Sequence, residues 1–89
     1  MQPTIGQIVQ YRITEDDTNT LNRRRVLLSH MGNHAYPGDT YPALVVRVEG
    51  EAPDQTCNLR VLMDGTDTHW VTSRPQGTEP GTWSWLPST

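Results

Sequence analysis

Apolar side chains recur at every second position in several short segments, and this pattern constrains the fold more than any other feature of the chain. In "GQIVQYRI", Val9, Tyr11 and Ile13 share one face, whereas Gln10 and Arg12 share the other. A strand with one buried face and one solvated face has this period of two. The segment therefore predicts a half-buried β-strand.

Four further segments predict strands: "ALVVRVE", "CNLRVLM", "THWVTS" and a short "TWSWL". The inward positions that we expect in the first two of these are Leu44, Val46, Val48, Cys57, Leu59, Val61 and Met63. The "DGTD" between the third and fourth strands predicts a hairpin, because Asp-Gly suits the positive φ angles of a tight turn.

One helix is predicted after the first strand, in "TEDDTNTLNRRRVLL". Thr14 can cap it, and the acids at 15–17 fall in the first turn, where the helix dipole favours negative charge. The arginines fall near its end, where cations are favoured. Threonine and asparagine form helices weakly, so we expect a helix of about two to three turns.

The chain has 89 residues, of which 34% are hydrophobic and none is Phe. It is long enough for one domain, residues 1–89, with a small core, and oligomerisation would add burial. Five short strands, close turns and one helical insertion predict a mainly β fold. We expect a small five-stranded SH3-like barrel or a strongly bent antiparallel sheet.

Composition also narrows the setting. The single cysteine, Cys57, gives neither an internal disulfide nor a cysteine-only zinc site, which fits a reducing compartment. No apolar run has transmembrane length, and "MQPTIGQIVQYR" lacks the pattern of a signal peptide. We therefore expect a cytoplasmic protein without a membrane partner. The net charge of −3 argues against sequence-blind binding to nucleic acid.

Three consecutive arginines stand in "LNRRR", although the chain contains no lysine. The planar guanidinium holds phosphate or carboxylate with two parallel hydrogen bonds, so the run predicts an anion site. Successive helix residues point about 100° apart, so at most two arginines converge. We expect Arg24 and Arg25 to be the inward pair, because Arg25 lies one turn after apolar Leu21. The alternative is a solvated helix end paired with the acids of the first turn.

The loop "GNHAYPGDTYP" supplies further candidates. Asn33 and Asp39 suit ribose hydroxyls or a base edge, and Tyr36 or Tyr41 suits stacking on a base. The alternative is a turn in which Asn and Asp bond their own backbone. Of the three tryptophans, one is expected in the core and another at an interface or stacking surface. The predicted ligand-binding set is Asn22, Arg23, Arg24, Arg25, Asn33, Asp39, Tyr41, Trp70 and Trp83.

The sequence contains little that predicts a metal site or a catalytic site. A zinc site of His30, His34 and His69 is disfavoured, because Gly32 interrupts the helical spacing and no H-E-x-x-H motif is present. We expect no metal and no cofactor. No nucleophile elbow or phosphate-binding Walker loop occurs, so we expect a binding protein rather than an enzyme. Hydrolysis by an aspartate (Asp17 or Asp39) stays open.

Nearly the whole chain resembles short proteins encoded by tailed phages and prophages. The resemblance rests on "YRITEDD", "LNRRR", "GDTYP", "DGTDTHWVTS" and "PGTWSWLP". Such proteins usually end in Trp-His-Trp-Pro, whereas here Ser84 replaces the histidine and Leu86 precedes Pro87, so no role of a histidine is carried over. The resemblance implies a phage origin and a small β-rich fold, without a catalytic mechanism.

Together these features predict a phage-encoded protein that sequesters a phosphate-containing, nucleotide-type signal of the host, as a counter-defence. The ligand would lie between subunits of a homo-oligomer. One alternative is a virion accessory or protein-interaction module that uses the Trp-rich C-terminal segment. The other is an SH3-like barrel that binds nucleic acid.

Overall fold

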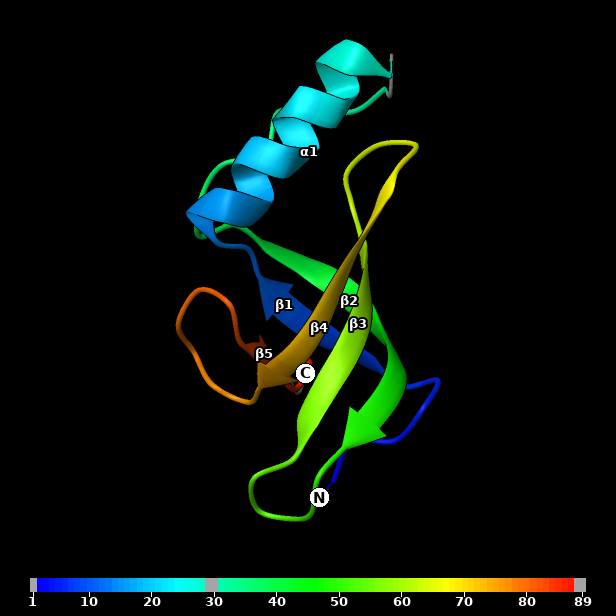
Figure 1. Ribbon diagram of the computed structural model, residues 1–89, viewed down its shortest axis with the longest axis vertical. Coiled ribbons are helices and arrows are strands. Elements are labelled where there is room, and N and C mark those ends of the chain that lie inside the picture. The colour runs from blue at the N-terminus through cyan, green and yellow to red at the C-terminus, as the bar shows by residue number, and fades with distance from the viewer. Residues whose placement is uncertain (1, 29–30, 88–89) are drawn as a thin grey trace.

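The computed structural model describes residues 2–28 and 31–87. Five antiparallel strands form one strongly curled sheet, a half-barrel, and a single helix stands at one end of it (Figure 1). The elements are β1 (Ile8–Arg12), α1 (Glu15–Leu27), β2 (Thr40–Glu49), β3 (Thr56–Leu62), β4 (Thr68–Pro75) and β5 (Trp83–Ser84). Their order in the sheet is β4-β3-β2-β1-β5. The predicted mainly β fold, a bent antiparallel sheet with one helical insertion, is confirmed.

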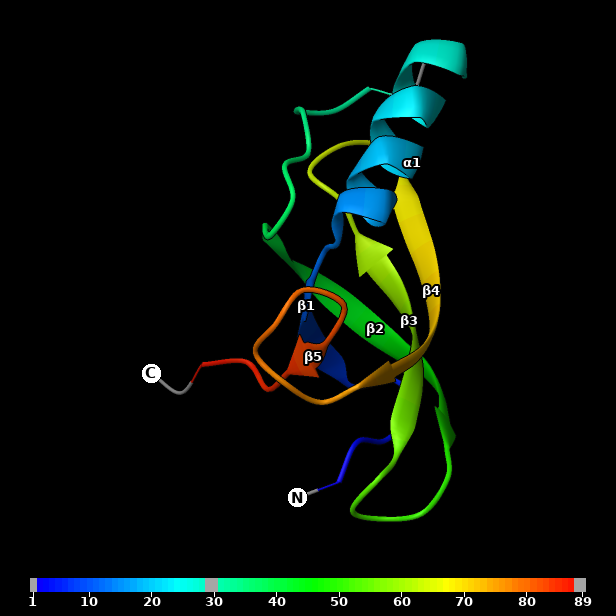
Figure 2. The same ribbon diagram turned by 60° about the vertical axis from the view of Figure 1, so that its left-hand side comes forward.

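The two edge strands, β4 and β5, approach each other through the segment that joins them. Gln76 forms a parallel bridge with Trp83, and the Gly77 N–H donates to the Trp83 carbonyl at 2.9 Å. The loop after β4 crosses the open side of the curled sheet (Figure 2). The open side of the half-barrel is therefore spanned by a loop, with a single bridge between the two edges.

The core lies on the concave face of the sheet. Its buried apolar members are Val9, Tyr11, Ile13, Leu21, Ala35, Ala43, Val45, Cys57, Leu59, Val61, Met63, Val71 and Trp83. The predicted inward positions of β1 and β3 are confirmed, since all of them are on this list. Alternating burial along these strands follows from the period of two.

The predicted inward face of β2 is wrong over its first half. Ala43 and Val45 are fully buried, whereas Val46 is 37% exposed. The register against β3 shifts between Val45 and Arg47, and such a bulge moves the following side chains to the other face. Val48 therefore packs against the core again, as predicted, while Leu44 and Val46 fall outside it.

The "DGTD" segment connects β3 to β4 as predicted, but Gly65 is not among the glycines with positive φ. Gly65 instead faces Gly32 in an isolated antiparallel bridge. A Cβ on Gly65 would run into the Met31 carbonyl, and one on Gly32 would lie 2.8 Å from the Asp64 carbonyl. Both glycines are thus needed for the close approach of two backbones rather than for a turn.

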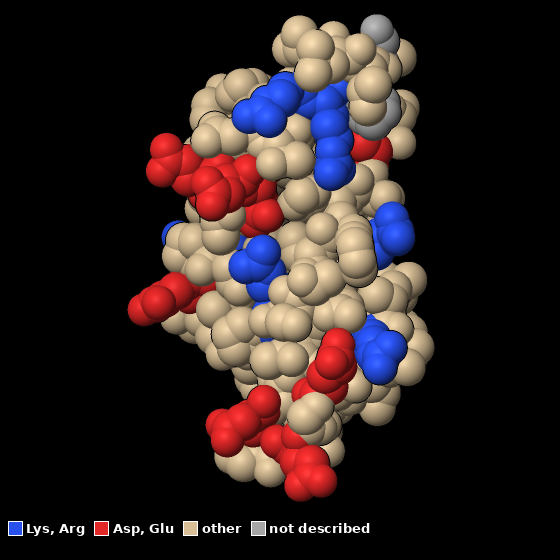
Figure 3. All heavy atoms as spheres, in the orientation of Figure 1, with Lys and Arg blue, Asp and Glu red and all other residues tan. Residues whose placement is uncertain are grey.

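Helix α1 begins at a capping box. The Thr14 hydroxyl accepts the Asp17 N–H at 3.0 Å, and the Asp17 carboxylate accepts the Thr14 N–H at 2.9 Å. The helix has 13 residues and is longer than predicted. On the face shown in Figure 3, acidic side chains gather near its start and basic ones toward its end. Helix α1 lacks the length and hydrophobicity of a membrane span, and residues 2–28 and 31–87 contain no other helix that has them.

A buried polar network joins α1 to the sheet. The Asp17 carboxylate accepts the Tyr11 hydroxyl at 2.7 Å and lies 2.9 Å from His69 Nε2. Only 6% of Asp17 and 5% of His69 are exposed. Burial alone would raise the pKa of Asp17, but hydrogen bonds from His69, Thr14 and Tyr11 together hold that pKa well below its usual range. The carboxylate thereby links β1, α1 and β4.

Asp17→Asn removes this charge with little change of shape. We expect it to lower the free energy of unfolding by about 1–3 kcal/mol at pH 7, because buried partners lose a charged acceptor. The lowered pKa means that ionised Asp17 stabilises the fold above about pH 4 and that this stabilisation is lost as the pH falls toward the folded-state value.

The difference in the free energy of unfolding between wild type and Asp17→Asn should therefore become smaller as the pH falls from 7 to 3, as measured by urea unfolding. Glu15→Gln, an exposed acid of the same helical turn, is the matched control and should show a smaller loss. A gap of constant size over this range would show that the charge of Asp17 is not what stabilises the network.

Candidate functional site

The nine residues predicted to bind a ligand do not come together at one place. Three of them hold the segment that follows α1: Asn22, Arg25 and Asn33. Three others pack in the core or form hydrogen bonds within their own turn: Asp39, Tyr41 and Trp83. The remaining three lie on outer surfaces: Arg23, Arg24 and Trp70. The structure therefore does not gather the nine residues into one pocket, and their predicted role in ligand binding stays a prediction.

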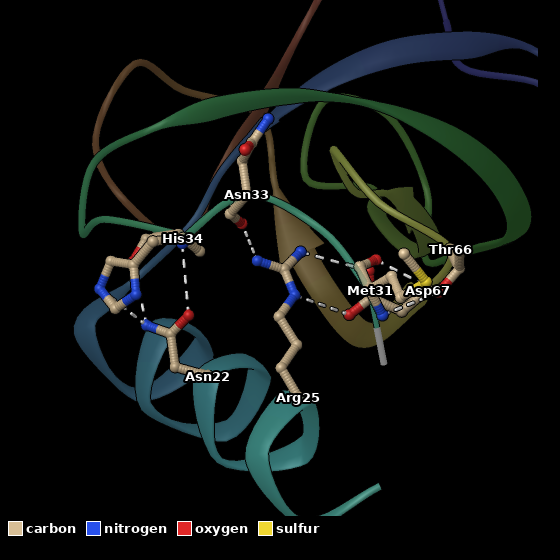
Figure 4. Close-up of polar contacts among 8 residues, drawn as sticks. Asn22, Arg25, Met31, Asn33, His34, Thr66 and Asp67 are labelled. Atoms are coloured by element: carbon tan, nitrogen blue, oxygen red, sulfur yellow. Dashed lines mark hydrogen bonds and ion pairs between the residues drawn. The ribbon is translucent and has the colours of Figure 1, made fainter. Parts of the chain in front are cut away.

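Arg25 points inward from α1, but the carboxylate it holds belongs to this chain. Its Nε and Nη2 each donate to an oxygen of Asp67 at 3.2 Å, and its Nη1 donates to the Asn33 carbonyl (Figure 4). The two side chains of the ion pair are only 9% and 3% exposed. We call the Arg25–Asp67 pair with Asn33 the helix latch. It connects the end of α1 to the β3–β4 hairpin, through Asp67, and to the loop that follows α1, through Asn33.

Two asparagines reinforce this connection. The side chain of Asn22 forms two hydrogen bonds with the backbone of Ala35: it donates to the carbonyl at 3.0 Å and accepts the N–H at 3.3 Å. The side chain of Asn33 donates to the Asp64 carboxylate at 2.7 Å. The amide groups predicted to read a ligand thus satisfy backbone and side-chain groups of the protein itself.

Asp39 and Tyr41 form a local turn, as in the alternative to ligand binding. The Asp39 carboxylate accepts the Tyr36 N–H at 3.1 Å and the Tyr41 hydroxyl at 3.2 Å. Burial, and then the nearby charge of Asp39, raise the pKa of Tyr41. Trp83 is 1% exposed and packs edge-on against Trp85, with ring centroids 5.0 Å apart. Trp83 is therefore a core residue.

Arg23, Arg24 and Trp70 remain accessible. Arg23 is exposed and Arg24 half-buried, and their side chains form no hydrogen bond or ion pair with the described residues. Trp70 is 58% exposed on the outer face of the sheet, where Arg60 lies opposite it in the β3–β4 register. These side chains are available to a partner.

A polar hollow that the sequence reasoning missed surrounds Arg12 at the end of β1. Its volume is about 180 Å³, and its lining consists of Arg12, Gly38, Thr40, Gly77, Thr78, Thr82 and Ser84. Arg12 donates from Nε to the Gly38 carbonyl at 3.0 Å and from Nη1 to the Thr78 carbonyl at 2.9 Å. We call this the Arg12 hollow. Its residues come from segments far apart in the sequence, which is why no motif indicates it.

The chemistry of the Arg12 hollow suits an oxyanion. The contacts to Gly38 and Thr78 engage two of the five N–H donors of a guanidinium, and hydroxyl groups supply further donors. The lining residues include no Asp, Glu, His or Cys. The hollow can therefore hold a phosphate or carboxylate group but carries no acid–base pair to cleave it.

The histidines and the open catalytic candidate lie elsewhere. His30 is outside the described residues. His34 is exposed and contacts Asn22 and Tyr36, whereas His69 is buried against Asp17. In residues 2–28 and 31–87, no three His, Cys, Asp or Glu side chains gather as metal ligands would. Of the two aspartates left open for hydrolysis, Asp17 is buried within its own network and Asp39 bonds within its turn, and neither lines the Arg12 hollow.

Comparison with known proteins adds no identification. No protein-family model, curated protein or solved structure matches the chain.

Arg25→Ala tests the helix latch. Removing one partner of a buried ion pair costs about 3–5 kcal/mol, so we expect a loss of that order in urea unfolding. Arg25→Lys should recover only part of it, because lysine lacks the planar fork. Arg47→Ala breaks the exposed Arg47–Glu49 pair, in which N and O are 3.7 Å apart, and should cost about 0–1 kcal/mol. Equal losses for Arg25→Ala and Arg47→Ala would contradict a structural role of the latch.

Proposed function

We propose that this protein is a small binding module that holds a phosphate-containing ligand of the nucleotide type, with a phosphate group in the Arg12 hollow. The observation that carries the proposal is the guanidinium of Arg12, which keeps N–H donors unused by its two carbonyl contacts and sits among hydroxyl groups. Arginine recognises phosphate through such a fork, and charge-assisted hydrogen bonds are about twice as strong as neutral ones.

The volume of the Arg12 hollow determines which part of a ligand fits inside it. Pockets that enclose a whole small molecule usually measure about 300–1,000 Å³, so about 180 Å³ suits one phosphate group. A second hollow of about 490 Å³ is lined by Pro53, Asp54, Gln55, Pro75, Gln76 and Gly77, and it shares Gly77 with the first. Glutamine amides both donate and accept, which suits the edge of a base. The two hollows together support a nucleotide-type ligand.

We propose that the biological role of this binding is to sequester the ligand. Without an acid–base pair in the lining, a bound phosphate ester would be retained rather than cleaved. The resemblance to short phage proteins provides a setting in the cytoplasm of a bacterial host, where binding a nucleotide immune signal would benefit the phage. We include a homo-oligomer in this proposal, because the small core leaves several large apolar side chains exposed.

Isothermal titration with pyrophosphate, cyclic dinucleotides and ADP-ribose tests the proposal. Arg12→Ala should weaken binding by about 1.5–3 kcal/mol, roughly 10- to 150-fold in Kd. Gly77→Ala should also weaken binding, because its Cβ would lie 3.0 Å from Thr82 inside the hollow. Arg60→Ala removes the same charge from the outer face of the sheet and is the matched control. Binding that is absent, or equally weakened by Arg12→Ala and Arg60→Ala, would overturn the assignment.

Nucleic-acid binding is a second candidate, favoured by exposed Trp70 and its cross-strand neighbour Arg60. An aromatic ring beside arginine on a sheet is a platform on which bases of single strands stack. Fluorescence anisotropy with a single-stranded oligonucleotide distinguishes this candidate. Binding that falls steeply with salt and is lost in Trp70→Ala, but not in Arg12→Ala, would favour it over the Arg12 hollow.

A further inference from the structure

Helix α1 has the surface of an element that packs against more than its own sheet. Only Asp17, Thr18 and Leu21 are buried among its residues. At its end and in the following segment, four large apolar side chains are 61–81% exposed: Val26, Leu27, Leu28 and Met31. In a chain with a small core, several exposed apolar side chains at one end of a helix indicate a surface suited to a partner.

Charge is segregated along the outward face of this helix. Asp16 and Arg23 are both exposed and lie seven residues apart. At 100° and 1.5 Å per residue, they point within about 20° of each other and are about 10 Å apart along the axis. The face therefore carries a negative group near its start and a positive group toward its end, in agreement with the distribution in Figure 3.

We propose that two copies of this chain pair through α1, antiparallel and about a two-fold axis, with Asp16 of each copy opposite Arg23 of the other. An acid at 16 and a base at 23 then meet twice, because a two-fold interface repeats every contact. The centre falls between Asn19 and Thr20, which are small enough for two helices to approach. A parallel arrangement would place like charges opposite each other. This charge pattern is complementary to itself, which favours a second copy over another protein.

The exposed apolar end of the helix gains a contact in the same arrangement. Val26 lies one turn beyond Arg23, so in the antiparallel pair it lies just beyond the first residue of the partner's helix. That start is bordered by the 36–39 turn, since Ile13 exchanges backbone hydrogen bonds with Gly38 and Asp39. Tyr36 of this turn is 60% exposed and offers an apolar surface to Val26 of the other copy. The pairing rests on the homo-oligomer of the proposed function but not on the Arg12 hollow.

Charge-swap variants and light scattering coupled to size exclusion test the pairing. The wild type should be a dimer. Asp16→Arg and Arg23→Asp should each weaken dimerisation, by roughly a hundredfold, because like charges then face each other. The two single variants mixed together should form a heterodimer, and the double variant should restore the homodimer. Circular dichroism of each variant checks that it is folded.

Arg47→Asp, a charge reversal at an exposed position of β2, is the matched control and should leave the dimer intact. A wild type that is monomeric at high micromolar concentration would overturn the pairing. So would a dimer that is indifferent to both reversals, because it must use another surface. Titration of phosphate-containing ligands onto Arg23→Asp separates the two proposals: retained binding in a monomer leaves the Arg12 hollow standing.

Discussion

The buried carboxylate of Asp17 is the interaction on which the arrangement of helix and sheet depends. It accepts hydrogen bonds from Tyr11 on β1 and from the Thr14 backbone, and it contacts His69 on β4. Leu21 is the only buried apolar residue of α1, so the hydrophobic effect alone would hold the helix weakly. Asp17 near its start and Arg25 near its end fix it instead, through polar contacts that are largely buried.

The alternation of apolar residues predicted most of the fold because burial on one face of a strand imposes a period of two. It failed in β2, where "ALVVRV" offers apolar residues to both faces and only pairing with β3 determines the bulge between Val45 and Arg47. Thr14 was predicted correctly as a cap because capping is local. The burial of Asp17 was not predicted, since the partner that holds it, His69, lies 52 residues later in the chain.

The candidate site was harder to predict for a physical reason. A guanidinium fork binds a carboxylate of its own chain as well as it binds a ligand's phosphate, so residue type alone does not separate the two. Arg25 was expected to point inward and does, but its partner is Asp67, which the sequence assigned to a turn. Arg12 was assigned to a solvated face, and the loops that surround it approach only in three dimensions.

The three consecutive arginines diverge because helical geometry turns each about 100° from the last. Arg25 serves the fold, and Arg23 faces away from it, so the two cannot share a ligand. The Arg12 hollow nevertheless lies close to the start of α1: the Arg12 carbonyl accepts the Gly81 N–H at 2.8 Å, and a Cβ on Gly81 would be 3.2 Å from the Thr14 methyl. In the proposed dimer, Arg23 of the partner subunit reaches Asp16, two residues beyond Thr14. Asp16 offsets the charge of that Arg23, so the Arg12 hollow draws its positive charge from its own subunit and can hold a phosphate whether or not the two copies pair.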